Sequence, residues 1–358
     1  TSQTWKSINM SKPVIIISAG GTGGHIFPAL AVARQLTDSY DVVWVGAKVG
    51  MENQIIPQNG YPLETVSVAG VRNKGVLRKL MLPFTMLRAL FECWCILRKH
   101  RPTTVIGFGG YATFPILLAA RILGKKTLIH EQNSVAGLTN RVLAKIVNQV
   151  LTAFPNVLNS TKTQLVGNPV RQEIIDIAPP ASTNTTGKLN ILIVGGSLGA
   201  KALNDNVPLA LNAVKDKIGS IVHQIGRNDG STVADFYREH DLNAQVVNFI
   251  DNMAEAYSNS DVIICRAGAS TVAEVSCAGK CAIFVPYPYA VDDHQTHNAA
   301  YLVEQGAAFL LPQSKLTPES LASLIDELNP EKCQQIGLKA KSLAITNSTE
   351  LICAAIWN

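Results

Sequence analysis

The chain of 358 residues lacks the features that mark several large protein classes. No stretch reaches the roughly 18 uncharged apolar residues that a membrane-spanning helix needs, and no long Lys/Arg tract marks a dedicated nucleic-acid binder. Charged residues make up 16% of the chain and apolar residues 47%, which excludes disorder as the main state. We therefore expect a folded protein with no membrane span and no nucleic-acid partner.

Cysteine pairs with the two-residue gap of zinc or redox sites are also missing. Cys93 and Cys95 are separated by one residue, and Cys277 and Cys281 by three. The seven cysteines are an odd number without the dense spacing of disulfide scaffolds, which favours reduced thiols in a cytosolic compartment. We expect them to be small, buried apolar residues.

Two units of strand, glycine turn and helix are present, one near the start of the chain and one near its middle. Val14 to Ser18 leads into Gly20-Gly-Thr-Gly-Gly24 and a helical pattern from Pro28 to Leu36. Leu189 to Val194 leads into Gly195-Gly-Ser-Leu-Gly199 and a helix from about Lys201 to Lys215. At roughly 100 to 200 residues per domain, these two openings predict two domains.

Short apolar strands alternate with helical stretches in both halves, which predicts an α/β fold with two doubly wound parallel sheets. A linker signal, Gly167-Asn-Pro-Val-Arg171 followed by a Pro/Ser/Thr-rich stretch, places the domain boundary near 170 to 188. Ligands of such domains bind at the carboxyl ends of the strands, so the cleft between the domains is the expected site. The other predicted strands are Asp41–Val45, Thr104–Ile106, Lys126–Ile129, Gln149–Thr152, Ser220–Gln224, Gln245–Phe249, Val262–Cys265 and Ala282–Val285.

Both glycine turns can bring backbone N–H groups to an anion at a helix N-terminus. The first is not a dinucleotide fingerprint, because Ile26 stands where its last glycine belongs. The second is not a nucleotide-hydrolysing P-loop, because Lys201 is flanked by alanines where Gly and Ser/Thr are needed. A plain tight connection remains the alternative for either turn.

Three histidine-containing segments are candidates for catalysis or metal binding. His25 follows the first turn and is a candidate general base, or a residue that merely caps the helix. His130-Glu-Gln-Asn-Ser134 lacks the second histidine of a zinc protease and follows a strand, so that interpretation fails. Asp292-Asp-His-Gln-Thr-His-Asn298 is better explained as a polar loop for a hydroxyl-rich ligand than as a metal site.

Cys265 to Glu274 runs from a strand into a helix and presents amides and a hydroxyl to an anion. A carboxylate at Glu274 suits hydrogen bonding to a ribose diol. The alternative is a Ser/Thr helix cap with an acidic partner one turn later.

The segment Lys74 to Arg101 carries seven Lys and Arg against one Glu, a formal charge of +6 in a chain whose total is +5. Large apolar residues recur in it at helical spacing, and Pro83 is expected to start the second of two helical pieces. Such a segment can lie in the headgroup region of an anionic bilayer. A core-facing helix with solvated charges is the alternative.

Several motifs follow one another between about residue 13 and residue 305. They are Gly20-Gly-Thr-Gly-Gly-His-Ile-Phe-Pro-Ala-Leu-Ala, Phe108-Gly-Gly-Tyr111, His130-Glu-Gln-Asn133, Gly167-Asn-Pro-Val-Arg171, Gly195-Gly-Ser197 and Cys265-Arg-Ala-Gly268 through Glu274. In this order they resemble the MurG family of bacterial transferases, which add N-acetylglucosamine to the lipid-linked muramyl-pentapeptide precursor of peptidoglycan.

The resemblance implies a GT-B fold, in which two Rossmann-like domains face a cleft. Residues 1–170 would bind the acceptor and the membrane and residues 171–340 the UDP-sugar, and a helix at about 340–358 would pack back on the first domain. It also implies a peripheral enzyme at the cytoplasmic face of the inner membrane, active in cell shape and division and accompanied by other cell-wall synthesis proteins.

The resemblance further implies roles for single residues. UDP-N-acetylglucosamine would bind mainly the second domain, with its diphosphate at Ser197, Thr271 and Arg171. The Ile250 backbone would contact uracil and Glu274 the ribose. Asn133 and Gln295 would hold the sugar, and the acceptor would lie along Thr22, Gly23, Gly24 and Tyr111. The remaining substrate-binding candidates, at the helix after Gly268, are Ala269, Ser270, Val272 and Ala273.

Two positions depart from the family pattern. Leu198 stands where many relatives carry Gln, which leaves a phosphate contact there open, and Thr113-Phe114 replace a Ser-Gly pair, which leaves the acceptor wall open.

The expected reaction is an inverting transfer in which His25 takes the proton of the muramyl 4-hydroxyl. No cofactor or tightly bound metal is expected, since backbone amides can stabilise the leaving diphosphate and the sequence has no Asp-x-Asp pair. Two other functions stay open, a UDP-sugar epimerase and a non-catalytic nucleotide-sugar-binding module.

Overall fold

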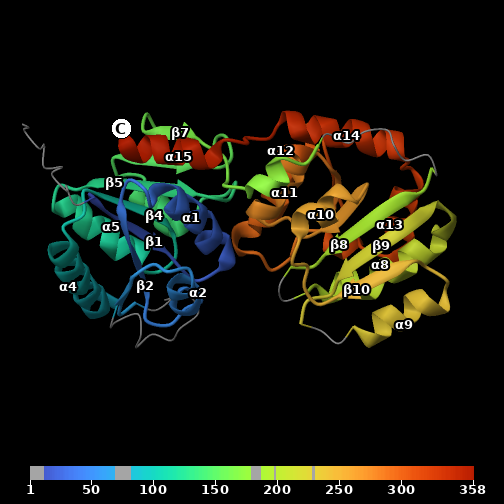
Figure 1. Ribbon diagram of the computed structural model, residues 1–358, viewed down its shortest axis with the longest axis horizontal. Coiled ribbons are helices and arrows are strands. Elements are labelled where there is room, and N and C mark those ends of the chain that lie inside the picture. The colour runs from blue at the N-terminus through green and yellow to red at the C-terminus, as the bar shows by residue number, and fades with distance from the viewer. Residues whose placement is uncertain (1–11, 69–81, 179–186, 197–198, 228–229) are drawn as a thin grey trace, which may run out of the picture.

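The computed structural model describes residues 12–68, 82–178, 187–196, 199–227 and 230–358, which form two α/β lobes (Figure 1). A seven-stranded sheet with the order β3-β2-β1-β4-β5-β6-β7 lies in the first lobe, and a six-stranded sheet with the order β10-β9-β8-β11-β12-β13 lies in the second. Every strand pairing in both sheets is parallel. The predicted pair of doubly wound domains is confirmed.

The first sheet is buried on both faces, as parallel sheets are. Ile15 and Ile17 of β1 belong to a core cluster with α1 and α15, whereas Ile16 belongs to a cluster with α4 and α5 on the opposite face. Alternate residues of one strand thus fill two cores. The elements are β1 (Val14–Ala19), α1 (Gly23–Leu36), β2 (Asp41–Ala47), α2 (Glu52–Gln58), β3 (Leu63–Val66), α4 (Leu82–His100), β4 (Thr104–Gly109), α5 (Thr113–Ile122), β5 (Lys126–Glu131), α6 (Leu138–Leu143), β6 (Gln149–Thr152) and β7 (Thr163–Leu165).

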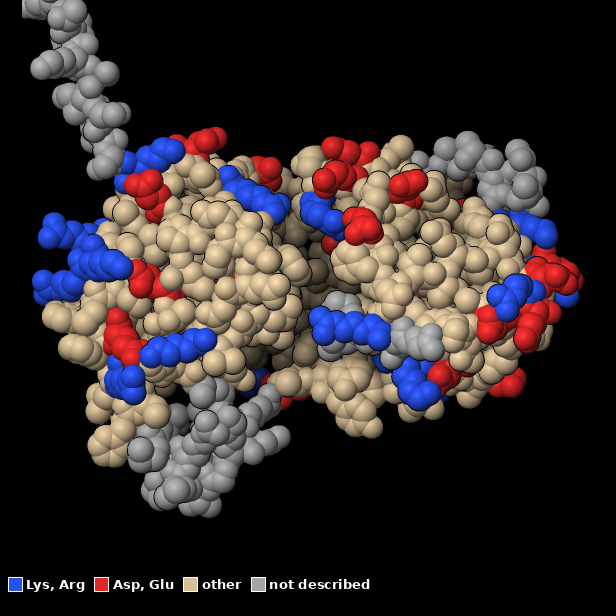
Figure 2. All heavy atoms as spheres, turned by 60° about the horizontal axis from the view of Figure 1, so that its bottom comes forward, with Lys and Arg blue, Asp and Glu red and all other residues tan. Residues whose placement is uncertain are grey.

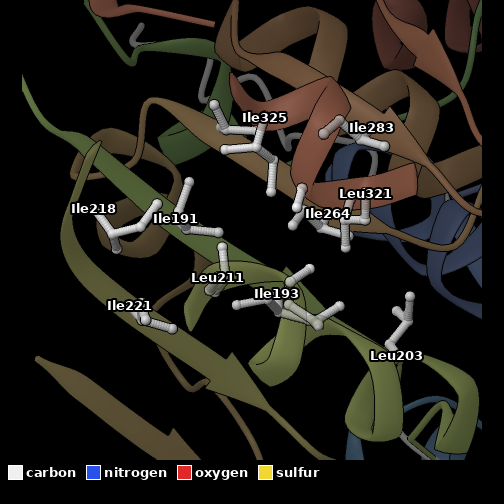
Figure 3. Packing of buried hydrophobic residues seen from close by; sticks show 14 of the residues in the cluster. Ile191, Ile193, Leu203, Leu211, Ile218, Ile221, Ile264, Ile283, Leu321 and Ile325 are labelled. Atoms are coloured by element: carbon white, nitrogen blue, oxygen red, sulfur yellow. The ribbon is translucent and has the colours of Figure 1, made fainter. Parts of the chain in front are cut away.

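The second sheet follows the same logic. Ile191 and Ile193 of β8 point into a cluster that Leu203 and Leu211 of α8 and Leu321 of α13 complete (Figure 3). Leu192 points to the other face, which α10, α11 and α12 cover. The elements are α7 (Gln172–Ile175), β8 (Leu189–Val194), α8 (Lys201–Ala213), η1 (Lys215–Lys217), β9 (Ile218–Gln224), α9 (Ser231–Glu239), β10 (Ala244–Val247), α10 (Met253–Ser258), β11 (Val262–Cys265), α11 (Ala269–Ala278), β12 (Cys281–Phe284), η2 (Val291–Asp293), α12 (His294–Val303), β13 (Phe309–Leu310), η3 (Gln313–Lys315), α13 (Pro318–Asp326), α14 (Pro330–Ser342) and α15 (Ser348–Trp357).

The chain crosses between the lobes twice. It first leaves β7 for α7, which packs against α10 and α11 of the second lobe. After α14 it returns, and α15 packs on α1 of the first lobe (Figure 1). Lys126 Nζ of β5 donates to the carbonyl oxygens of Ala355 and Ile356 at 2.8 and 2.9 Å, which holds the end of α15 in place.

Some boundaries differ from the sequence prediction. Helix α1 begins at Gly23 inside the glycine turn, five residues before the predicted Pro28, because the backbone of Gly23 and Gly24 is already helical there. The edge strands β3, β7 and β13 were not predicted. The predicted linker from 178 to 187 and the first part of the basic segment, Lys74 to Met81, lie almost wholly outside the described residues.

The thiols follow the prediction with one exception. All seven cysteines are free and six are buried, but Cys95 on α4 is exposed. Burial raises the pKa of the Cys93 thiol to about 12. Among the residues that the structure describes, no helix combines the length and apolar character needed to cross a bilayer.

Candidate active site

The order of each sheet reverses at one point, between β1 and β4 in the first lobe and between β8 and β11 in the second. Ligands of doubly wound domains bind outside the strand ends at this switch point. Figure 2 shows a hollow between the two lobes, and α1 contacts α11 across it. The loops that follow β1, β4, β8 and β11 are therefore the frame of the candidate site.

The turn after β1 is held from two sides. Gly20 N–H donates to Gly109 O at 3.1 Å, which joins it to the loop after β4. The buried carboxylate of Glu52 accepts from Gly21 N–H at 3.1 Å and from Ala47 N–H at 3.0 Å. Gly21 has a φ of +87°, a conformation that glycine adopts without strain. Two neighbouring elements thus fix the turn that precedes His25.

His25 lies in the first turn of α1 and is partly exposed. Its Nδ1 lies 3.0 Å from Gln132 Oε1, and its Nε2 has no hydrogen-bond partner among the described residues. The ring rests on Gly109, where a Cβ atom would come within 2.8 Å of the imidazole. The Thr22 side chain makes no cap hydrogen bond, and the N–H groups of Gly23 and Gly24 belong to the helix turn that has no acceptors within the helix.

The rest of the predicted acceptor side follows β4 and β5. Tyr111 is 57% exposed and follows the carboxyl end of β4. Asn133 follows β5, and its side chain is already engaged, donating to Glu131 Oε1 at 3.4 Å and accepting from Asn298 Nδ2 at 3.3 Å. Thr113, one of the departures, is buried and donates to Gly109 O at 2.8 Å. Its hydroxyl supports the loop from inside, so it is not part of an acceptor wall.

In the second lobe, the start of α11 presents the predicted anion site. Gly268 is the N-cap, so the N–H groups of Ala269, Ser270 and Thr271 lie at the positive end of the helix. Val272 N–H donates to Gly268 O at 2.9 Å, and Ala273 is the next residue of the helix. The turn after β8 faces the same end of the sheet, but Ser197 and Leu198 lie outside the described residues.

Glu274 lies one turn into α11 and has two partners. It accepts from Tyr257 OH at 3.0 Å, and Arg171 Nη2 lies 3.8 Å from its other oxygen. Burial raises the pKa of the Glu274 carboxyl, against the opposing effects of Arg171 and of the Tyr257 hydroxyl. Arg171 is half exposed at the N-cap of α7, so the structure brings together two residues that the sequence predicted for ribose and diphosphate.

The remaining predicted contacts also lie at this end of the second sheet. Ile250 follows β10 and packs partly against the core. Gln295, in the first turn of α12, accepts from Tyr287 N–H at 2.9 Å, which leaves its amide nitrogen for a ligand. In the described part of the chain no three His, Cys, Asp or Glu residues cluster as metal ligands would.

Three functional contacts were not predicted. Asn298 is fully buried and bridges the lobes, accepting from Ser134 N–H and Oγ at 2.8 and 2.9 Å and donating to Ala267 O at 3.2 Å. Glu52 supports the first turn, and Gln132 contacts His25. Gln132 and Asn298 lie in the His130–Asn133 motif and in the polar segment Asp292–Asn298, whereas no sequence motif contains Glu52.

Two Rossmann-like domains that face a cleft, with helix N-termini and a carboxylate at its edge, have the architecture of the GT-B fold. The calicheamicin glycosyltransferase CalG4 shares this fold, with a TM-score of 0.67 at 13% identity over 97% of this chain and 99% of its own. The profile of the glycosyltransferase family 28 N-terminal domain matches residues 15–152, and that of the family 28 C-terminal domain matches residues 190–352.

Proteins with higher sequence identity to this chain identify its family within the glycosyltransferases. The crystal structure of Acinetobacter baumannii MurG has a TM-score of 0.86 at 42% identity, covering 97% of this chain and 99% of that one. A protein of Neisseria gonorrhoeae is 47% identical over 97% of this chain and 98% of its own length, and one of Cupriavidus pinatubonensis is 45% identical over 94% and 96%. Both are named UDP-N-acetylglucosamine–N-acetylmuramyl-(pentapeptide) pyrophosphoryl-undecaprenol N-acetylglucosamine transferase. The chain belongs to glycosyltransferase family 28 and, within it, to the MurG family.

Proposed function

We infer that this chain transfers N-acetylglucosamine from UDP-N-acetylglucosamine to the 4-hydroxyl of lipid-linked N-acetylmuramyl-pentapeptide, the step from lipid I to lipid II in peptidoglycan synthesis. Relatives with this name match nearly the whole chain. The observation that carries the proposal is His25, whose Nε2 has no partner in the described chain, on a helix that contacts the Glu274 helix across the cleft.

The donor binds the second lobe. The leaving diphosphate accepts hydrogen bonds from the first amides of α11 and from Thr271 and Ser197, and Arg171 adds a positive charge. Glu274 binds the ribose diol, the Ile250 backbone binds uracil, and the amide of Gln295 binds the sugar. These donors stabilise charge where it develops, so the reaction needs no tightly held metal.

The acceptor binds the first lobe, along Thr22 to Gly24 and Tyr111. The acceptor oxygen attacks the anomeric carbon while its proton passes to His25 Nε2. The bond from the anomeric carbon to the phosphate oxygen breaks, and UDP leaves with the electron pair from the opposite face. The configuration at the anomeric carbon is thereby inverted.

Release of UDP with and without the lipid-linked acceptor tests the proposed reaction. We expect release that depends on the acceptor, together with a disaccharide product. Turnover of the UDP-sugar without acceptor would assign an epimerase, and binding without release would assign a nucleotide-sugar-binding module. Either result overturns the proposal.

A second test addresses the donor site. Glu274→Gln and Glu274→Ala are expected to weaken UDP binding by about 1 to 3 kcal/mol, because a charge-assisted contact to two hydroxyls is lost. Isothermal titration measures the affinity. Glu239→Ala, an exposed carboxylate at the end of α9, is the matched control. Unchanged UDP affinity in both variants would show that Glu274 does not bind the ribose and is only a structural partner of Tyr257.

We also propose that α4 docks the enzyme on the cytoplasmic face of the inner membrane. Its inner face packs Cys93 and Leu97 into the core. On its outer face Phe84, Leu87 and Phe91 are 64 to 69% exposed, although such residues are ordinarily buried. Arg98 lies 5.0 Å from the Trp94 ring, and the basic segment to which these residues belong runs from Lys74 to Arg101. An apolar face with flanking cations suits anionic headgroups.

The docking face predicts a vesicle phenotype. Replacing Phe84, Leu87 and Phe91 together by serine is expected to abolish co-sedimentation with anionic vesicles, because each buried side chain contributes about 1.5 to 3 kcal/mol. Leu209→Ser with Leu338→Ser, exposed leucines of the second lobe, is the control. High salt weakens binding of the unmodified protein by screening. Turnover of a short, water-soluble acceptor stays unchanged. Undiminished vesicle binding by the folded triple variant would contradict docking through α4.

At this surface, other cell-wall synthesis proteins are expected partners, and a role in cell shape and division follows from the proposed reaction.

A further inference from the structure

A chain of three hydrogen bonds runs from the first crossing between the lobes to His25. His130 Nε2 lies 2.9 Å from Gly167 O, Gln132 Nε2 lies 3.1 Å from His130 Nδ1, and Gln132 Oε1 lies 3.0 Å from His25 Nδ1. His130 and Gln132 are both buried, and neither carries a role in the proposed chemistry.

The donor and the acceptor of every hydrogen bond in this chain follow from the first bond, between His130 and Gly167. A carbonyl oxygen can only accept, so His130 Nε2 carries a proton that it donates to Gly167 O. Full burial lowers the pKa of His130 to about 4, so the ring is neutral and its Nδ1 is an acceptor. The Gln132 amide must therefore turn its nitrogen to His130 and its oxygen to His25. A flipped amide would place oxygen against the Nδ1 lone pair.

The hydrogen bond between Gln132 Oε1 and His25 Nδ1 determines which ring nitrogen of His25 carries the proton. Because Gln132 presents an oxygen, His25 Nδ1 must be the donor, and in the neutral ring the lone pair is then on Nε2. The frame around this bond is rigid: Asn168 Nδ2 donates to Gln132 O at 3.0 Å, and the His130 ring packs against Phe108 with 5.3 Å between centroids.

We propose that Gln132 and His130 are positioning residues that hold His25 in the Nδ1–H tautomer, which leaves Nε2 free to accept a proton. The kinetic part of this inference rests on the proposed function, in which His25 is the base. We call the chain of hydrogen bonds from Gly167 through His130 and Gln132 to His25 the relay. When Nε2 takes the proton, the Nδ1–H bond to Gln132 remains, so the relay also stabilises the imidazolium.

The tautomer can be measured without substrate. The full-length protein is labelled with ¹⁵N in its histidine rings, and long-range ¹H–¹⁵N spectra are recorded at pH 8.5, above the ordinary titration range of histidine. Loss of a signal set in His25→Ala and in His130→Gln assigns the two rings. We expect opposite tautomers, Nδ1–H for His25 and Nε2–H for His130. An Nε2–H tautomer at His25 would overturn the inference.

Gln132→Met tests the relay itself, since methionine keeps the length of the side chain but offers no amide. We expect the His25 signals to change to a mixture of tautomers, and kcat to fall about tenfold with the KM for UDP-N-acetylglucosamine unchanged. Gln149→Met is the matched control, because the Gln149 side chain bonds, within the part of the chain that the structure describes, only to Gln164 of the edge strand β7. Unchanged tautomer and kcat in Gln132→Met would refute the relay.

Failure of the proposed function has a different signature. If Gln132→Met shifts the tautomer while His25→Ala retains full transfer activity, the relay exists but His25 is not the base. If His25→Ala is inactive while Gln132→Met keeps the Nδ1–H tautomer, His25 is the base and the relay is refuted.

Discussion

His25→Ala is expected to lower the rate of transfer by about 10²- to 10⁴-fold, because a positioned general base contributes on this scale. The affinity for UDP-N-acetylglucosamine should stay nearly unchanged, since the proposed donor contacts lie in the second lobe. The measurements are single-turnover transfer to the lipid-linked acceptor and titration with the UDP-sugar.

His240→Ala is the matched control for this loss. His240 lies in the second lobe, at the end of α9, and stacks on Phe236, away from both glycine turns. Its removal should leave transfer intact. If His25→Ala turned over at the rate of the unmodified protein, His25 would be a helix-terminal residue without catalytic function.

Gly110→Ala is expected to lower transfer about 10²-fold, although residue 110 carries no reactive group. Gly110 has a φ of +101°, and a Cβ atom there would lie 2.8 Å from Gly20 O and 2.9 Å from Gly20 N. The collision is with backbone that leads directly into the turn before His25, and a displacement of about 1 Å at a reacting group can cost about 10² in rate.

Gly124→Ala is the control that separates the effect of backbone strain from the effect of a steric clash. Gly124 also has a positive φ, of +68°, but a Cβ atom there meets nothing within 4 Å. Both variants should lose about 1 to 3 kcal/mol of unfolding free energy from the strained backbone, whereas only Gly110→Ala should lose turnover. Equal turnover in the two variants would show that the contact between the two loops does not position His25.

The predictable part of the fold is its buried part. The inner strands β1, β4, β8 and β11 are mostly apolar because both of their faces are covered, and such strands are visible in sequence. The missed strands lie at or next to sheet edges. Strand β7 has two exposed residues of three, and β13 has two residues in all, so neither leaves an apolar pattern to find.

The candidate site divides in the same way. Glycine turns and side chains that directly follow a strand can be located from sequence, because the position of the strand determines the position of the residues after it. The contacts that hold them cannot, since Gln132 is 107 residues from His25 and Asn298 is 164 residues from Ser134. Thr113 illustrates the limit: the sequence left its part in the acceptor wall open, and the structure shows its buried hydroxyl donating to Gly109 O.

The return of α15 to the first lobe makes that lobe discontinuous in sequence, whereas the second lobe is one continuous stretch from α7 to α14. A polypeptide that ends near residue 170 would lack Ile352, Cys353 and Ile356, which are buried in the first core, and would expose the apolar face of α1 that they cover. An independently folding acceptor lobe therefore requires α15 to be rejoined through a short linker or by circular permutation. The two crossings also tie the lobes together at two points, before α7 and before α15.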